Sequence, residues 1–326
     1  MTDLPVARPG LPYRIFLSWL RRAAKGRDGL PIPDRLTPES LAALRRMTGM
    51  PSFPQVLSAL QIRSWRSLDI PCGEHVRPAR LYRPRGEVTG IILFLHGGGF
   101  VHCDLVSHHG MCCRLARHAG AMVLSLDYRL APEHPYPAAV EDSWAALKWL
   151  DHQAGMRDLP IAVCGDSAGG NLAAVLARRA GVEGMWRVVA QLLYYPTVSG
   201  LWSPSSRAVY AEGFMLTARL LDWYGRQYIR QDRDMLDPDF APVFADDLSA
   251  APPGMIVTAG FDPLRGEGEL YATLLREAGV RVRLVCCAKA IHGFLNFYAV
   301  VVEGRRALRL GGAYLRAQFA RYKEAQ

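Results

Sequence analysis

A serine flanked by glycines stands where an apolar run meets a helical pattern. Ser167 lies in a Gly-Asp-Ser-Ala-Gly motif, after the apolar residues 161–164 and before an alanine- and leucine-rich stretch that begins at Ala168. On a sharp turn from strand to helix, a serine hydroxyl is pushed out of the sheet, and the helix start adds positive potential where negative charge develops. Gly165 and Gly169 leave room where a Cβ would collide with the neighbouring strand and helix. The pattern predicts a nucleophilic serine for acyl transfer; the alternative is a glycine-rich turn in which the serine is incidental.

A second glycine-rich loop could supply the donors that acyl transfer needs for its oxyanion. Residues 96–100 read His-Gly-Gly-Gly-Phe and directly follow the apolar run 91–95. Backbone N–H groups can stabilise an oxyanion if the loop comes close to the substrate, which three consecutive glycines permit. We expect Gly97 and Gly98 to donate, with Ala168 as the third donor. A phosphate-binding loop is disfavoured because the run is not Gly-x-Gly-x-x-Gly and has no lysine downstream.

Chain order selects the catalytic base. In hydrolases whose serine lies on such a turn, the acid and then the histidine follow it along the chain. Of the nine histidines, only His292 lies after Ser167, in a segment that follows the apolar run 282–286. We therefore predict that His292 takes the proton of the serine.

An acid must orient this histidine and stabilise its cation. It should lie at the end of the apolar run 255–259, and Asp262 stands there. Glu267 and Glu269 are the alternatives, but they fall one or two turns into the next helical stretch. Asp262 is therefore the predicted acid.

The elements that must position these residues alternate along the chain. Residues 62–70 and 75–82 alternate apolar and polar side chains and predict two antiparallel strands. Six apolar runs have the length and β-branched content of strands buried on both faces: 91–95, 121–126, 161–164, 188–193, 255–259 and 282–286. Helices are expected at about 107–118, 138–153, 168–180, 263–278 and 302–322. This alternation predicts an α/β fold, a mostly parallel sheet flanked by helices.

Two segments interrupt the alternation and predict a helical cap. Residues 1–55 favour helix and are punctuated by proline. Residues 197–250 are too long for a simple crossover and contain a helical pattern at about 217–229. Together they are typical of a cap over one edge of the sheet. Residues 56–196 and 251–326 would then form the catalytic domain.

Composition limits the partners and the compartment. The 326 residues are 50% hydrophobic and 21% charged, which is typical of a globular protein, and the net charge is +9. There is no long lysine and arginine run and no nucleic-acid motif, so we expect a solvated basic surface and no nucleic-acid partner. Seven cysteines without a Cys-x-x-Cys motif predict reduced thiols in a cytoplasmic protein. We expect no signal peptide and no membrane-spanning segment.

Taken together, the motifs resemble the bacterial hormone-sensitive-lipase-like family of esterases. Three further segments are similar to that family: residues 127–139, 193–196 and 212–217. The resemblance implies an α/β-hydrolase fold with an eight-stranded sheet, a triad of Ser167, Asp262 and His292, and an oxyanion hole of Gly97, Gly98 and Ala168. It also implies hydrolysis of small-molecule esters with short to medium acyl chains, without a metal or organic cofactor. Family members often pair through the last strand and the C-terminal helix, so a homodimer is expected.

The chain departs from that family in two places. Residues 266–268 read Gly-Glu-Gly where the family usually has Asp-Glu-Gly, and residues 107–109 read Ser-His-His where it has Thr-His-Asp. We expect Gly266 to affect local stability or orientation and the change ending at His109 to affect the pocket wall. Neither is expected to affect the triad.

The predicted activity is therefore hydrolysis of carboxylic esters through an acyl-enzyme on Ser167. An amidase, a deacetylase or an acyltransferase could use the same triad. A ligand receptor on an inactive hydrolase scaffold is also conceivable, but such receptors typically lack the histidine that is present here as His292. Apolar acyl groups need an apolar slot, and the candidate pocket residues are Phe100, Tyr195, Trp202, Tyr210, Phe214, Leu216, Trp223, Ile291 and Phe294.

Overall fold

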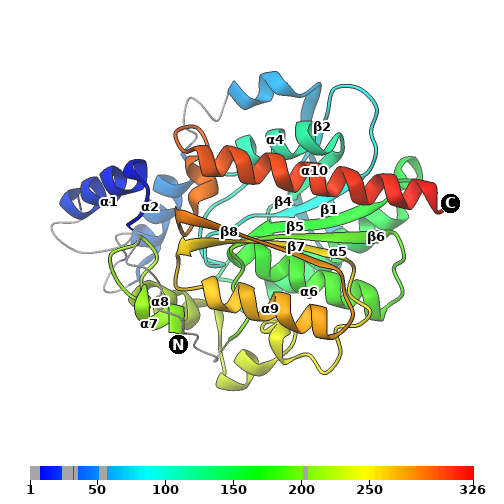
Figure 1. Ribbon diagram of the computed structural model, residues 1–326. Coiled ribbons are helices and arrows are strands. Elements are labelled where there is room, and N and C mark those ends of the chain that lie inside the picture. Colours follow the sequence, from blue (N-terminus) through cyan, green and yellow to red (C-terminus); the bar gives the residue numbers. More distant parts are fainter. Residues whose placement is uncertain (1–7, 24–31, 33–35, 51–56, 201–204) are drawn as a thin grey trace.

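The computed structural model describes residues 8–23, 32, 36–50, 57–200 and 205–326. Within these residues, eight strands form one sheet in the order β1-β2-β4-β3-β5-β6-β7-β8 (Figure 1). β2 runs antiparallel to both β1 and β4, and all the other neighbours are parallel. The strands are β1 Ser64–Cys72, β2 His75–Arg83, β3 Ile91–Leu95, β4 Met122–Leu126, β5 Ile161–Asp166, β6 Val188–Tyr194, β7 Gly254–Phe261 and β8 Val282–Ile291. The predicted α/β fold with a mostly parallel sheet is confirmed.

Burial explains which strands the sequence located well. All residues of β3, β4, β5 and β7 are buried. Strands covered on both faces need apolar side chains throughout, so their apolar runs mark them almost residue by residue. β8 is an edge strand that stays partly exposed until Ala290 and Ile291. Its apolar run therefore ends before the strand does, and the predicted 282–286 is too short.

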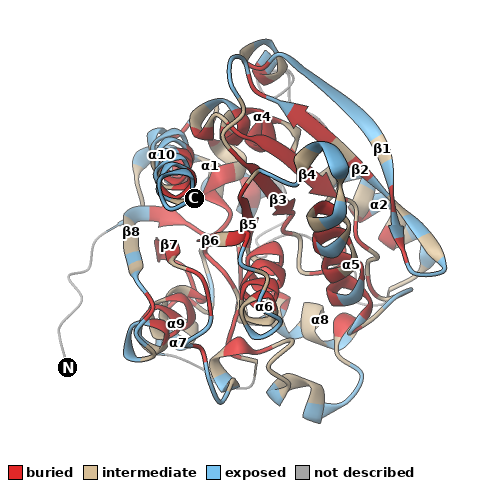
Figure 2. Cartoon of the chain, turned by 90° about the vertical axis from the view of Figure 1, so that its right-hand side faces the viewer, coloured by how far each residue is buried: buried red, intermediate tan, exposed pale blue. Residues whose placement is uncertain are grey.

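Helices cover both faces of the sheet (Figure 1). α4 (His109–Ala119) and α10 (Val302–Glu324) pack together on one face, and α5 (Ala138–His152), α6 (Ala168–Val182) and α9 (Arg265–Glu277) lie on the other. Successive residues of β3 face opposite ways: Leu93 joins the apolar cluster under α5 and α6, and Phe94 joins the one under α4 and α10. Buried residues accordingly concentrate in the sheet and on the inner helix faces (Figure 2).

The remaining described α-helices lie at one end of the molecule (Figure 1). They are α1 (Leu11–Ala23), α2 (Pro38–Gly49), α7 (Ser205–Val209) and α8 (Ala218–Tyr228). The hydroxyls of Thr37 and Thr217 accept the N–H groups of Ser40 and Leu220 at 3.2 and 3.1 Å, which fixes where α2 and α8 begin. Helices from both predicted cap segments thus lie at the same end of the molecule.

None of the helices in the described ranges is both long enough and apolar enough to cross a membrane.

Candidate active site

Ser167 occupies a strained turn between β5 and α6. Its φ of 54° and ψ of −118° lie in a region that non-glycine residues rarely adopt. A Cβ at Gly165 would overlap the carbonyl oxygen of Gly169, and a Cβ at Gly169 would overlap the carbonyl oxygen of Leu95. The two flanking glycines are required because backbone approaches backbone there.

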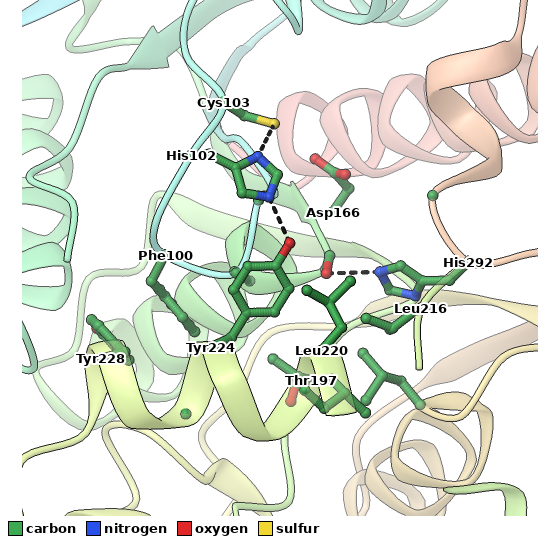
Figure 3. A pocket seen from close by; sticks show the side chains of 18 of the residues that line it. Phe100, His102, Cys103, Asp166, Thr197, Leu216, Leu220, Tyr224, Tyr228 and His292 are labelled. Carbon is green, nitrogen blue, oxygen red and sulfur yellow. Dashed lines mark hydrogen bonds between the residues drawn. The ribbon is translucent and has the colours of Figure 1, made fainter. Parts of the chain in front are cut away.

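Ser167, His292 and Asp262 form one chain of hydrogen bonds. The Oγ of Ser167 lies 2.9 Å from Nε2 of His292 (Figure 3), and Nδ1 of His292 lies 2.8 Å from Oδ2 of Asp262. Asp262 is fully buried and His292 is 6% exposed, so water competes little for these bonds. If Nδ1–H donates to the carboxylate, Nε2 is left to accept the serine proton, as a general base requires.

The sheet register brings the acid to the histidine. After a register shift between Ala259 and Phe261, Phe261 pairs with Ile291 across β7 and β8. Asp262 and His292 are the next residues of these two parallel strands, so they leave the sheet side by side. The other oxygen of Asp262 accepts the N–H of Leu264 at 2.8 Å, which holds the carboxylate in place.

The alternative acids are engaged elsewhere. Glu267 is buried, and its carboxylate accepts the N–H groups of Val198 and Ser199 at 2.8 and 3.1 Å. Burial raises the pKa of Glu267. Glu269 pairs with Arg265 at 2.8 Å. Glu267 therefore anchors the chain that follows β6, and the hydrogen bond to His292 comes from Asp262.

The oxyanion prediction needs one correction, at Gly97. The N–H of Gly97 donates to Oδ1 of Asp166 at 2.9 Å, so it is already engaged. The next two glycines have φ values of 112° and 60°, and both line the cavity in front of Ser167 together with Ala168. Gly98, Gly99 and Ala168 are therefore the candidate donors, and Gly99 was not among the donors predicted from the sequence.

A buried carboxylate under the serine holds the oxyanion loop. Besides Gly97, Asp166 has Nε2 of His108 at 3.1 Å and the hydroxyl of Tyr195 at 3.4 Å. Burial opposes ionisation of Asp166, but the contact with His108 and the Gly97 N–H outweigh it and lower the pKa of Asp166. Within residues 107–109, where the chain departs from the family pattern, His108 thus supports this loop through Asp166. His109 points away, toward the Tyr82 hydroxyl at 3.1 Å.

Gly266, the other departure from the family pattern, lies where α9 contacts α7. The N–H of Gly266 donates to Oγ of Ser206 in α7 at 3.0 Å, and that hydroxyl donates to the carbonyl oxygen of Pro263 at 2.8 Å. A serine of α7 thus engages the start of α9 at the position where the family carboxylate is missing.

A cavity of about 640 Å³ opens in front of the serine. Helix α8 supplies much of its wall, and α1 and α2 contribute Phe16 and Thr48. Of the predicted pocket residues, Phe100 and Leu216 line this cavity, while Trp202 lies outside the described residues. Nowhere in the described part of the chain do three or more histidine, cysteine, aspartate or glutamate side chains form a group that could hold a metal ion.

The structure places the other predicted pocket residues outside the cavity wall. The ring of Tyr195 packs edge-on against the ring of His292 at 4.9 Å, and Phe294 packs against Tyr195 at 5.3 Å. Ile291 is fully buried at the end of β8. Phe214 packs against Tyr210 at 5.4 Å. These five residues and Trp223 are absent from the cavity wall. The prediction was wrong for them because aromatic and aliphatic side chains can pack behind a site as well as line it.

Sequence reasoning missed the inner face of α8. Leu220, Tyr224 and Tyr228 recur every four residues and line the cavity, and Leu221 and Ile229 lie beside them. The periodicity was visible in the sequence as one apolar face. Which neighbour that face meets depends on the tertiary arrangement.

Comparisons with known proteins point to one family. Residues 92–296 match the family described as alpha/beta hydrolase fold. The carboxylic ester hydrolase LipN of Mycobacterium tuberculosis is 44% identical over 84% of this chain and 74% of its own length. The carboxylesterase NlhH of the same organism is 37% identical over 97% of this chain and 98% of its own. An esterase structure from Pyrobaculum calidifontis superposes with a TM-score of 0.85 at 41% identity, covering 95% of this chain and 98% of that one.

Proposed function

The chain belongs to the α/β-hydrolase family, with relatives of the hormone-sensitive-lipase-like esterase type, and from this we propose that it hydrolyses carboxylic esters through an acyl-enzyme on Ser167. The observation that carries the proposal is the hydrogen-bonded chain Ser167–His292–Asp262 at the wall of a cavity. Relatives named carboxylic ester hydrolase and carboxylesterase support the ester as the bond that is cleaved.

In the proposed mechanism, each group has one task. His292 takes the proton of Ser167 as Oγ attacks the ester carbonyl, and the buried carboxylate of Asp262 stabilises the imidazolium. The N–H groups of Gly98, Gly99 and Ala168 hold the oxyanion of the tetrahedral intermediate. His292 then protonates the departing alcohol, and a water molecule hydrolyses the acyl-enzyme by the same route.

We also propose that residues 1–55 and 197–250 act as a cap on a catalytic domain of residues 56–196 and 251–326. The support is the mixed cavity wall: Phe16 and Thr48 come from the first segment, and Leu220 and Tyr224 from the second. The triad and the oxyanion loop come from the catalytic domain. The cap would therefore select the substrate, while the sheet would perform the chemistry.

Location and assembly complete the proposal. All seven cysteines are free thiols, which fits a reducing cytoplasmic setting. β8 is an edge strand, and a second copy of the chain could pair there and along α10, as the family resemblance implies. A small-molecule ester is the proposed substrate.

An acyl-chain series of p-nitrophenyl esters, with a p-nitroanilide as the amide counterpart, tests the reaction class. Leu216 and Leu220 offer apolar surface beside the serine, and each methylene buried there contributes about 0.8 kcal/mol. The wall also carries Arg226, Arg230 and Asp232, which a long chain would desolvate. We expect kcat/KM to peak between acetyl and hexanoyl and to fall at least about tenfold for dodecanoyl, a loss of about 1.4 kcal/mol in transition-state stabilisation.

Ser167→Ala, run in parallel, serves as the background for every substrate. Turnover of the anilide at a rate similar to the ester would favour an amidase. A profile that keeps rising to dodecanoyl would contradict the preference for short and medium chains.

A further inference from the structure

The backbone of His102 is hydrogen-bonded to the proposed oxyanion loop, residues 96–100. Its N–H and the N–H of Val101 donate to the carbonyl oxygen of Gly98, at 3.1 and 3.0 Å. A Cβ at Gly98 would overlap the carbonyl oxygen of His102. Because these two residues are in direct backbone contact, a displacement of His102 would displace Gly98, one of the proposed oxyanion donors.

The side chain of His102 reaches helix α8. Its Nε2 lies 2.6 Å from the hydroxyl of Tyr224, and its Nδ1 lies 3.2 Å from Sγ of Cys103 (Figure 3). Both ring nitrogens are therefore engaged, which fixes the plane of the ring. Tyr224 also covers the next glycine, since a Cβ at Gly99 would overlap its ring.

This group of side chains stays neutral at ordinary pH. Burial, helped by the neighbouring His96 and His108, lowers the pKa of His102 to about 3. Burial also raises the pKa of Tyr224 and that of the Cys103 thiol. Cys103 is therefore a thiol that hydrogen-bonds to a neutral histidine, which is not the thiolate that a cysteine nucleophile requires.

A second contact joins the same loop to the same helix one turn later. Phe100 stacks on Tyr228 with a ring separation of 3.9 Å and an interplanar angle of 3°. The hydroxyl of Tyr228 has no hydrogen-bond partner among the described residues. The two tyrosines of α8 thus both touch the oxyanion loop, but of the two only Tyr224 forms a hydrogen bond with it, to Nε2 of His102.

We propose that the hydrogen bond between His102 and Tyr224 holds the oxyanion loop in position against α8, a helix of the proposed cap. We call this hydrogen bond the latch. The proposal rests on the proposed function, because it assigns positioning residues for the same reaction. Neither residue touches the reacting atoms; they act through Gly98 and Gly99. Closure of α8 onto the loop would then align the oxyanion donors as the cavity is completed.

Tyr224→Phe removes the latch and keeps the ring on Gly99. Tyr271→Phe is the matched control, because Tyr271 is buried in α9, away from the cavity wall, and its hydroxyl has no hydrogen-bond partner among the described residues. With p-nitrophenyl butyrate, we expect Tyr224→Phe to lower kcat about tenfold with KM changed less than about twofold, because the lost alignment acts on the transition state. Affinity for a trifluoromethyl ketone, which forms an oxyanion on the serine, should fall by the same factor as kcat/KM. Tyr271→Phe should change each quantity less than about twofold.

A double-mutant cycle with His102→Leu isolates the pair. The double variant should be no slower than the slower single variant, because the bond can be lost only once. Equal kcat and inhibitor affinity in Tyr224→Phe and Tyr271→Phe would overturn the proposal, as would losses that multiply in the double variant. A lower Tm of Tyr224→Phe with unchanged kcat would also overturn it, since the bond would then serve only folding. Full activity of Ser167→Ala, by contrast, would refute the proposed function itself.

Discussion

Replacing Ser167 with alanine is expected to lower kcat for p-nitrophenyl butyrate by at least about 10⁴-fold. The hydroxyl is the atom that His292 contacts at 2.9 Å, and no acyl-enzyme can form without it. The strained φ of Ser167 is accessible to alanine at similar cost, so the turn should survive. Purified enzyme, a spectrophotometric assay and the Tm of both proteins measure the effect.

Ser143→Ala provides the control for loss of a buried hydroxyl. Ser143 is fully buried in α5 and donates to the carbonyl oxygen of Ala139 at 2.7 Å. Its removal should leave kcat within about twofold of the parent value while costing about 1 kcal/mol of stability. Substantial turnover by Ser167→Ala would remove the serine from the mechanism.

Asp262→Asn is expected to lower kcat by about 10³- to 10⁴-fold with the fold intact. Asparagine has the shape of aspartate, but its amide N–H₂ facing Nδ1 would stabilise the wrong histidine tautomer. It also removes the negative charge that stabilises the imidazolium during attack. Rates over a range of pH, together with the Tm, separate this chemical loss from unfolding.

Glu267→Gln is the matched control because it alters the competing buried carboxyl. The amide oxygen of glutamine can still accept the N–H groups of Val198 and Ser199. Burial raises the pKa of Glu267, so a neutral amide differs less from the native group there. We expect a change in kcat below about threefold. Equal losses in the two variants would contradict the assignment of Asp262 as the acid.

Much of the fold could be predicted from apolar runs in the sequence. β3 covers Ile91–Leu95, the predicted run, because both faces of that strand are buried. The predicted β8 ended too early because β8 is an edge strand, where one-sided exposure interrupts the apolar run. The end of β8 nevertheless positions the proposed base, because Ile291 pairs with Phe261 and His292 directly follows Ile291.

The proposed triad could be predicted from a motif and from chain order, whereas the proposed oxyanion donors could not. Ser167 is indicated by its motif, and His292 is indicated because it is the only histidine that follows Ser167 in the sequence. The three glycines after His96 are chemically identical in sequence. Only the contact between Gly97 and Asp166, 69 residues apart, decides which N–H groups remain available.

The pocket was the least predictable part because it is built by tertiary contacts. Tyr195 and Phe294 are aromatic and lie close to the triad, yet Tyr195 packs against the ring of His292 and Phe294 packs against Tyr195, outside the cavity wall. Tyr224 and Tyr228 are similar in type, yet they line the cavity. Which side of a residue faces the substrate depends on how α8 packs against the loop after β3, and no local pattern encodes that.

The most direct test of the central claim is to map the residue that a fluorophosphonate modifies. An activated serine attacks phosphorus, forms a bond from Oγ to phosphorus and releases fluoride, and tandem mass spectrometry of the digest identifies the modified peptide. The account predicts a single adduct on Ser167 that forms in step with the loss of esterase activity and is absent from Ser167→Ala. An adduct on another residue that tracks the loss of activity, or full activity in enzyme phosphonylated at Ser167, would contradict it.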